Sequence, residues 1–187
     1  MRDIIISAGH RQMQEVGFAH FSAREVAKRV GYSIGTVYNV FGSYDGLILA
    51  INGRTLDLWL DYLQARLCAP HMDGDRLARA IDAYFEFAVI NRHTWAALYD
   101  FRLPDDVAAP DDYHARVDAI MAVVEHEVAA ALPHAHREDA AELTRSLLAM
   151  VHGHCFFTLN GTFRMLAETD PLAAARARVA DALARYR

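Results

Sequence analysis

The chain has 187 residues, 53% of them hydrophobic, which allows either one ordinary domain or a small domain followed by a larger one. Residues 1–45 hold five basic and four acidic side chains, a net charge of +1. The whole chain has a net charge of −5, so residues 46–187 have a net charge of −6. Two distant cysteines predict no disulfide framework, and the sequence predicts neither a signal peptide nor a membrane span, so we expect a cytoplasmic protein without a membrane partner.

The first predicted helix covers residues 2–16, because apolar residues recur there at helical spacing, and Gly17 ends it. Residues 22–41 follow as two short helices joined by a tight turn. Three helices are therefore expected by residue 41.

The two short helices carry the residues that helix ends require. Ser22 is expected to cap the first, with Glu25 three positions later, as in a capping box. Gly31 is expected to take the left-handed conformation after that helix, and Ser33 to cap the second. Any hairpin of two helices can share this pattern, but the two caps, the glycine and the inward-facing Val37 together predict a helix-turn-helix that enters a DNA groove.

The remaining sequence predicts a larger body made of helices. These are expected near residues 44–67, 75–92, 93–101, 111–132, 138–160, 162–166 and 172–186. The helix near 138–160 is apolar around more than one face, so we expect part of it to lie against a second subunit. Val89 is expected on the buried face of the helix near 75–92. Asp170 and Pro171 are expected to cap and to begin the last helix.

Several motifs resemble the N-terminal domain of the TetR family of bacterial transcriptional regulators. They are Gly17-Phe18, Ser22-Ala-Arg-Glu-Val-Ala, Gly31-Tyr-Ser-Ile-Gly-Thr-Val-Tyr and Phe41-Gly-Ser-Tyr-Asp-Gly-Leu47. The resemblance covers about residues 2–50, whereas the body matches only in length and helical layout. It implies an all-α fold, with an N-terminal three-helix DNA-binding domain in residues 1–45 and a larger ligand-binding and dimerisation domain in residues 46–187.

The same resemblance implies the partners of the protein. It implies a homodimer formed through the helices near 138–160 and 172–186, which reads an inverted repeat in a double-stranded DNA operator. It also implies a small-molecule effector that weakens DNA binding. Most proteins of this family are repressors, and some are activators.

The resemblance places the DNA contacts on the hairpin and on the start of the next helix. The candidates are Ser22, Arg24, Lys28, Ser33, Ile34, Gly35, Thr36, Tyr38, Asn39 and Tyr44. Thr36 and Asn39 are the candidates for base edges, because a hydroxyl and an amide can each donate and accept there. Tyr38 matches a position whose hydroxyl binds phosphate in the family. Lys28 could equally belong to a solvated face.

Position 44 departs from the family pattern. Members of the family usually have a lysine there, whereas this chain has Tyr44, which can donate one hydrogen bond to a phosphate but brings no charge. A weaker salt dependence of operator binding than a lysine at this position would give is therefore expected.

A ligand pocket is expected among the helices of the body. Its candidate lining combines aromatic residues with a few polar ones: Tyr84, Phe87, Asn91, Trp95, Tyr99, Phe101, His152 and Phe156. Pockets that are mostly apolar with a few polar groups are typical of ligand sites, so the expected effector is largely apolar or aromatic. Any single aromatic of this set could instead belong to the core.

The ten histidines raise the question of a metal site. The closest pairs are His134 with His136, expected in a loop, and His152 with His154. Residues two apart on a helix point to different sides, so the second pair is not expected to share a metal. Neither a metal nor another cofactor is expected.

An enzyme and a purely structural helical module are the two other classes to consider. The sequence has no nucleophile elbow, phosphate loop, Rossmann glycine cluster or zinc-protease motif, so no catalytic residue is expected. Tyr38 and Asn39, predicted on the surface of the second hairpin helix, have no packing role there and argue against a structural module.

Overall fold

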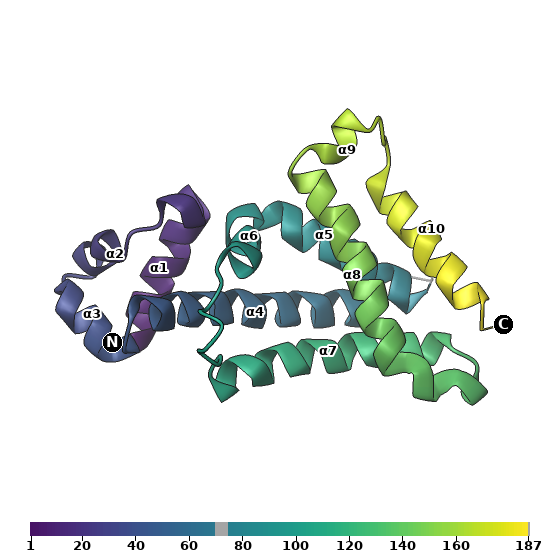
Figure 1. Cartoon of the computed structure of the whole chain (residues 1–187), viewed down its shortest axis with the longest axis horizontal. Coiled ribbons are helices and arrows are strands. Elements are labelled where there is room, and N and C mark those ends of the chain that lie inside the picture. The colour runs from purple at the N-terminus through teal and green to yellow at the C-terminus, as the bar shows by residue number, and fades with distance from the viewer. Residues whose placement is uncertain (70–74, 187) are drawn as a thin grey trace. The chain divides into compact units, whose positions relative to one another are not determined.

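The computed structural model describes residues 1–69 and 75–186, and all regular elements within those residues are helices (Figure 1). The chain forms two compact units. The N-terminal unit comprises Met1–Trp59 and Asn91–Asp118, and the C-terminal unit comprises Leu60–Ile90 and Ala119–Arg187. The all-helical fold predicted from the sequence is therefore confirmed.

The N-terminal unit is built around the helix-turn-helix. Its elements are α1 (Arg2–Val16), the 3-10 helix η1 (Phe18–His20), α2 (Ala23–Arg29), α3 (Ile34–Phe41), the first part of α4 (Tyr44–Cys68), α6 (Arg92–Asp100) and the start of α7 (Asp111–Ala131). Apolar residues that recur three and four positions apart on α1 and α4 face α2 and α3. Together with Val26 of α2 and Val37 of α3, they form a core that includes Ile5, Met13, Leu47, Ile48 and Ile51.

Helix α6 completes this unit from a distant part of the sequence. It packs against α1 and η1. The Nδ1 atom of His93 lies 2.8 Å from the carbonyl oxygen of Gln14, and Asn52 Nδ2 donates a hydrogen bond of 3.2 Å to the carbonyl oxygen of Ala97. The three helices expected by residue 41 are present, but they share their core with residues beyond position 90.

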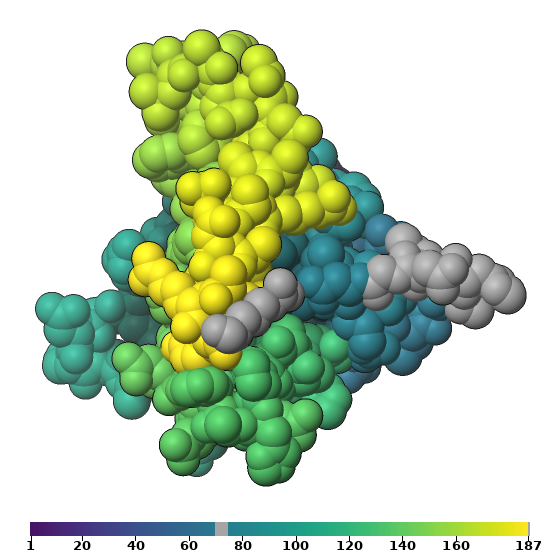
Figure 2. Space-filling view, turned by 90° about the vertical axis from the view of Figure 1, so that its right-hand side faces the viewer, coloured from purple at the N-terminus to yellow at the C-terminus, as the bar shows by residue number. Residues whose placement is uncertain are grey.

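The C-terminal unit contains the end of α4, α5 (Arg76–Ile90), the rest of α7, the 3-10 helix η2 (His134–Asp139), α8 (Ala140–Leu159), α9 (Thr162–Met165) and α10 (Pro171–Ala184). Helices α5, α8 and α10 pack against one another. The Asp170 side chain accepts a 3.0 Å hydrogen bond from the Ala173 amide, with Pro171 in the first turn, as predicted. Figure 2 shows α9 and α10 on one face of this unit.

Two local predictions were wrong. Val89 is 55% exposed, because α5 turns Tyr84, Phe87 and Ala88 inward at spacings of three and four residues, and Val89 falls outside that stripe. His134 lies in η2 and not in a loop.

Among the described residues, no single helix is long and apolar enough to cross a membrane. Only α3 and α4 taken together reach that length and composition, and the chain bends by 70° between them.

Candidate nucleic-acid interface and ligand-binding residues

Both predicted serine caps of the helix-turn-helix are present. Ser22 Oγ accepts a hydrogen bond of 3.4 Å from the Glu25 amide, and Ser33 Oγ accepts one of 3.0 Å from the Thr36 amide. The capping box is only half formed, because the Ser22 amide donates to Oε1 of Gln12 on α1, at 3.1 Å. The start of α2 is therefore tied to α1 through a buried amide side chain.

The turn between α2 and α3 has the hydrogen bonds of a Schellman motif. Gly31 has φ = 74°, the left-handed conformation predicted for it. Its amide donates to the carbonyl of Lys28 at 3.2 Å, and the amide of Tyr32 donates to the carbonyl of Ala27 at 3.0 Å. The carbonyls of Ala27 and Lys28, near the end of α2, therefore have backbone partners.

The structure places all ten predicted DNA-contact residues in the N-terminal unit, and none of them is buried. Ser22, Ile34, Thr36 and Tyr44 are half-buried, and the other six are exposed. The Thr36 hydroxyl lies 2.9 Å from Ser33 Oγ, so part of its hydrogen-bonding capacity is used within the cap. Asn39 has no such local bond in the described part of the chain, which leaves its amide available to a base edge.

Tyr44 is held between the helix-turn-helix and α4. Its ring centroid lies 6.3 Å from that of Phe21. Burial is the main reason why the pKa of Tyr44 is raised, and the neighbouring Tyr38 and Asp45 add to it. The hydroxyl therefore remains protonated at neutral pH and can donate one hydrogen bond.

The two cations at the end of α2 have different surroundings. Arg29 Nη2 lies 2.7 Å from Glu15 Oε2, and this hydrogen bond lowers the pKa of Glu15. Lys28, the only lysine of the chain, is exposed and makes no ion pair with the described residues. Lys28 is thus the better candidate for a phosphate, since Arg29 already has a carboxylate partner.

The junction of α3 and α4 depends on Gly46, which lies in one of the quoted motifs but had no role predicted for it. A Cβ atom at this position would lie 2.1 Å from the carbonyl oxygen of Phe41. The Gly46 amide donates to Ser43 Oγ at 3.0 Å, which caps α4. Glycine at position 46 therefore allows the last carbonyl of α3 to lie directly against the first turn of α4.

Four of the eight predicted ligand-binding residues lie in the N-terminal unit: Asn91, Trp95, Tyr99 and Phe101. Trp95 is buried, and its ring packs edge-on against Trp59 and Tyr99 at centroid distances of 5.9 and 5.7 Å. Phe101 packs edge-on against Phe18 at 5.9 Å and against the core of the unit.

The other four lie in the C-terminal unit: Tyr84, Phe87, His152 and Phe156. The Tyr84 hydroxyl is 2.8 Å from His152 Nδ1. The Phe156 ring stacks on the His152 ring, with a distance of 6.1 Å between the two ring centroids. Burial lowers the pKa of His152, so its imidazole is neutral at pH 7. The ring centroid of Phe87 lies 5.6 Å from that of Tyr62. The structure therefore brings Tyr84, His152 and Phe156 together as an aromatic cluster with a polar centre.

The close histidine pairs have separate partners. His154 Nδ1 lies 2.9 Å from the carbonyl of Met150, whereas His152 faces Tyr84. His136 forms a 3.4 Å contact with Asp139. Within residues 1–69 and 75–186, no three His, Cys, Asp or Glu side chains come together as a metal site would require.

Gln12 helps to hold the start of α2, and the sequence analysis did not identify this role. It is buried, and its side chain holds the start of α2. Its position relative to Ile5, Ala8 and Val16 places it on the apolar stripe of α1. A polar residue on such a stripe indicates a buried hydrogen bond, and that signal could have identified it.

The sequence matches two family descriptions that together cover most of the chain. Residues 5–51 match "Bacterial regulatory proteins, tetR family", and residues 77–183 match "Tetracyclin repressor-like, C-terminal domain". Among curated proteins, the chain is similar to the HTH-type transcriptional regulator BetI of Burkholderia ambifaria (strain MC40-6). The identity is 29% over 161 residues, which cover 82% of this chain and 81% of BetI.

Solved structures share the fold. A protein of unknown function from Rhodococcus sp. RHA1 superposes with a TM-score of 0.72 and 18% identity, over 96% of this chain and 91% of that chain. The multidrug binding protein EbrR, solved as a complex with imidazole, superposes with a TM-score of 0.59 and 18% identity, over 97% of this chain and 94% of its own.

Proposed function

The chain belongs to the TetR family of bacterial regulatory proteins, and on that premise we propose that it is a homodimeric repressor released from an inverted-repeat operator by a small, largely apolar or aromatic effector. Members of this family are DNA-binding transcriptional regulators and not enzymes. The observation that carries the proposal is the doubly capped helix-turn-helix, in which α3 keeps Tyr38 and Asn39 exposed.

Residues 1–45 are proposed to bind DNA, and residues 46–187 to bind the effector and the second subunit. Ser22, Arg24, Lys28 and Tyr44 would contact the DNA backbone, and α3 would enter the major groove. The contacts of α3 would come from Ser33, Ile34, Gly35, Thr36, Tyr38 and Asn39. The proposed place of action is the cytoplasm, where the bacterial chromosome lies.

The proposed effector site includes the aromatic cluster of the C-terminal unit. Tyr84, His152 and Phe156 offer ring surfaces around one neutral hydrogen-bonding group, which suits an aromatic compound with a polar end. Phe87 of the same unit is proposed to belong to this site, and Asn91, Trp95, Tyr99 and Phe101 of the N-terminal unit are proposed separately as ligand-binding residues. The fold shared with EbrR, a multidrug binding protein, supports a ligand of this kind.

DNA binding is tested with the DNA that flanks the protein's own gene, by mobility shift and by fluorescence anisotropy at several salt concentrations. We expect specific binding of two protomers per operator. Asn39→Ala should weaken specific binding by about tenfold or more, because a bidentate base contact is worth roughly 1–3 kcal/mol. Gln14→Ala is the matched control, since it removes an exposed amide from α1. Equal affinity for scrambled DNA at every salt concentration would contradict the proposal.

Effector binding is tested by thermal shift with neutral aromatic compounds and with highly charged metabolites. We expect stabilisation by some of the aromatic compounds, weakened by His152→Ala and accompanied by loss of operator binding. Stabilisation by highly charged metabolites alone would contradict the proposed class of effector.

A further inference from the structure

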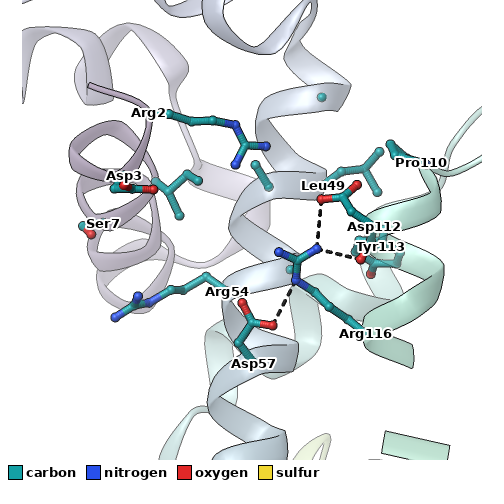
Figure 3. Close-up of a pocket in the computed structure, with 14 residues that line it drawn as sticks. Arg2, Asp3, Ser7, Leu49, Arg54, Asp57, Pro110, Asp112, Tyr113 and Arg116 are labelled. Atoms are coloured by element: carbon teal, nitrogen blue, oxygen red, sulfur yellow. Dashed lines mark hydrogen bonds and ion pairs between the residues drawn. The ribbon is translucent and has the colours of Figure 1, made fainter. Parts of the chain in front are cut away.

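The N-terminal unit contains a cavity of about 190 Å³ between α1, the first turns of α4 and the start of α7 (Figure 3). None of the predicted DNA-binding or effector-binding residues lines it. Its charged lining consists of three arginines and three aspartates: Arg2, Arg54, Arg116, Asp3, Asp57 and Asp112. Ile6, Leu49 and Pro110 supply apolar walls.

Arg116 is held in one orientation by two aspartates. Its Nε donates to Asp57 at 2.9 Å, and its Nη1 donates to the side chain and the backbone carbonyl of Asp112 at 2.9 and 2.7 Å. Gly53 gives it room, because a Cβ atom there would lie 3.3 Å from Arg116 Nε. Nη2 is the one nitrogen of this guanidinium that donates to no described residue, and Figure 3 shows it on the side away from Asp112.

Arg2 reaches into the same space from α1. Its guanidinium carbon lies 5.3 Å from the centroid of the Phe41 ring, which positions the group without neutralising it. Arg2 makes no ion pair within the part of the chain that the structure describes. Figure 3 shows the guanidinium groups of Arg2 and Arg116 directed toward a common space.

Tyr113 contributes a third donor to the lining. Its side chain is half-buried, and burial raises its pKa, so the hydroxyl is protonated at neutral pH. Among the described residues, this hydroxyl has no hydrogen-bond partner. The Arg2 guanidinium, Nη2 of Arg116 and the Tyr113 hydroxyl therefore line one small cavity, and among the described residues none of these three donors is taken up by an acceptor.

We propose that this cavity binds a small organic monocarboxylate. Guanidinium groups recognise carboxylates through charge-assisted hydrogen bonds, and the tyrosine hydroxyl adds a third donor. The three aspartates offset the three arginines, so the cavity offers a ligand directed donors and not a net positive charge, and a dianion is disfavoured more than a monocarboxylate. The cavity is smaller than the roughly 300–1,000 Å³ of pockets for drug-sized ligands, so the carboxylate carries only a small apolar body.

A structural role alone is the competing explanation for these arginines. The Arg116 pairs fasten α7 to α4, and that role explains Asp57 and Asp112. It does not explain why Arg2 and Tyr113 line the same cavity without a hydrogen-bond acceptor among the described residues. The two explanations differ in whether the cavity binds an added carboxylate.

The test is direct binding to the full chain without DNA, by calorimetry or by NMR. Benzoate is the probe, and benzamide and benzylamine are its neutral and cationic counterparts of the same size. We expect benzoate to bind about tenfold or more tightly than either, because charge-assisted hydrogen bonds are lost in both. Inorganic phosphate should bind more weakly than benzoate. Equal binding of benzamide, or tighter binding of benzylamine or phosphate, would overturn the proposal.

Variants locate the binding. Arg2→Gln should weaken benzoate binding about tenfold, and Tyr113→Phe by several-fold, the loss expected for one hydrogen bond. Arg11→Gln, an exposed arginine of α1 outside the cavity, is the control and should change nothing. Circular dichroism confirms that each variant is folded. Unchanged binding by Arg2→Gln would show that benzoate binds elsewhere.

This site is distinct from the proposed effector cluster, and the two are tested separately. His152→Ala should leave benzoate binding unchanged, and Arg2→Gln should leave binding of a neutral aromatic effector unchanged. Gly46 also lines the cavity, so an occupant would lie against the first turn of α4, at the glycine that meets the last carbonyl of α3. An effect on operator affinity rests on the proposed function, whereas benzoate binding itself does not.

Discussion

Tyr44 stands where the family usually has a lysine, and its ring packs against Phe21 while its hydroxyl stays protonated. Tyr44→Lys adds one cation per protomer at the start of α4. We expect the slope of log affinity against log salt concentration to steepen by about 0.9 for each added phosphate contact. Anisotropy titrations of the operator at several salt concentrations measure this slope.

Tyr44→Phe is the control for that substitution. It keeps the ring and adds no charge, so its salt slope should equal that of the parent. If Tyr44→Lys also leaves the slope unchanged, position 44 does not touch DNA.

His10 makes the stability of the N-terminal unit depend on pH. It is 6% exposed, its Nε2 has no hydrogen-bond partner in the described residues, and burial together with Arg54 lowers its pKa to about 4. The unfolded chain takes up a proton near pH 6.5, whereas the folded chain does not until about pH 4. Stability is therefore complete above the unfolded pKa and falls as the pH drops from about 6.5 to about 4.

Over this pH range the free energy of unfolding should fall by up to about 3 kcal/mol. Urea denaturation at several pH values between 7.5 and 4.5 measures it. His10→Leu should remove most of this pH dependence, whereas His20→Gln, at an exposed histidine of η1, should retain it. The same pH dependence in the His10→Leu variant would show that other groups cause it.

At the level of elements, two glycines of the helix-turn-helix are expected to respond oppositely to alanine. Gly31 has φ = 74°, so Gly31→Ala should destabilise the protein by roughly 1–2 kcal/mol. Gly35 lies in the first turn of α3, and a Cβ atom there meets only Ser33 Oγ at 3.6 Å. Gly35→Ala should therefore be neutral or stabilise by up to about 1 kcal/mol.

The DNA affinities of these two variants should show the reverse order. Gly35 is proposed to face the groove, so an added methyl group should weaken operator binding, whereas folded Gly31→Ala protein should bind nearly normally. Chemical denaturation and anisotropy measure the two properties independently. Equal stability of the two variants would contradict the role assigned to the left-handed turn.

The helix-turn-helix could be predicted because its determinants are local. Ser22, Ser33 and Gly31 act on amides and carbonyls within five residues of themselves, so their roles can be inferred from spacing. The partnership of Asn52 with Ala97 could not, because 45 positions separate them and neither has a local signature. Gly46 was missed for a related reason, since a contact with the Phe41 carbonyl depends on the path of the backbone.

The candidate ligand residues illustrate a second limit. An aromatic residue on an inward face fits a pocket and a core equally well, and only the contacts separate the two. Phe101 packs against Phe18 in the core of the N-terminal unit, whereas His152 has a buried hydroxyl partner in Tyr84. Neither arrangement follows from helical periodicity, because periodicity gives the face of a helix and not its neighbour.

At the level of the whole molecule, the proposed dimer should depend on the exposed aromatic face of α8. Phe156 and Phe157 are 47% and 40% exposed, which is unusual for adjacent phenylalanines on a long helix. The parent protein is expected to have about twice the chain mass of 20.9 kDa in solution. Phe157→Glu should shift it toward the monomer, because a carboxylate would be buried at the interface.

Light scattering coupled to size exclusion measures the mass of each variant. Val107→Glu is the control, since Val107 is an exposed apolar residue in the segment between α6 and α7. A monomeric parent protein, or a Phe157→Glu variant that remains dimeric, would contradict the proposed use of α8.

The contribution of α6 to the N-terminal unit has a consequence for biosynthesis. Residues Met1–Trp59 leave the ribosome first, but the unit also needs Asn91–Asp118. At about 5–20 residues per second, translation from Trp59 to Asp118 takes roughly 3–12 s. During that interval the surface of α1 that α6 will cover is open to solvent. The nascent chain therefore cannot complete its DNA-binding unit in the order of its synthesis, and its first helices depend on a segment that has not yet been made.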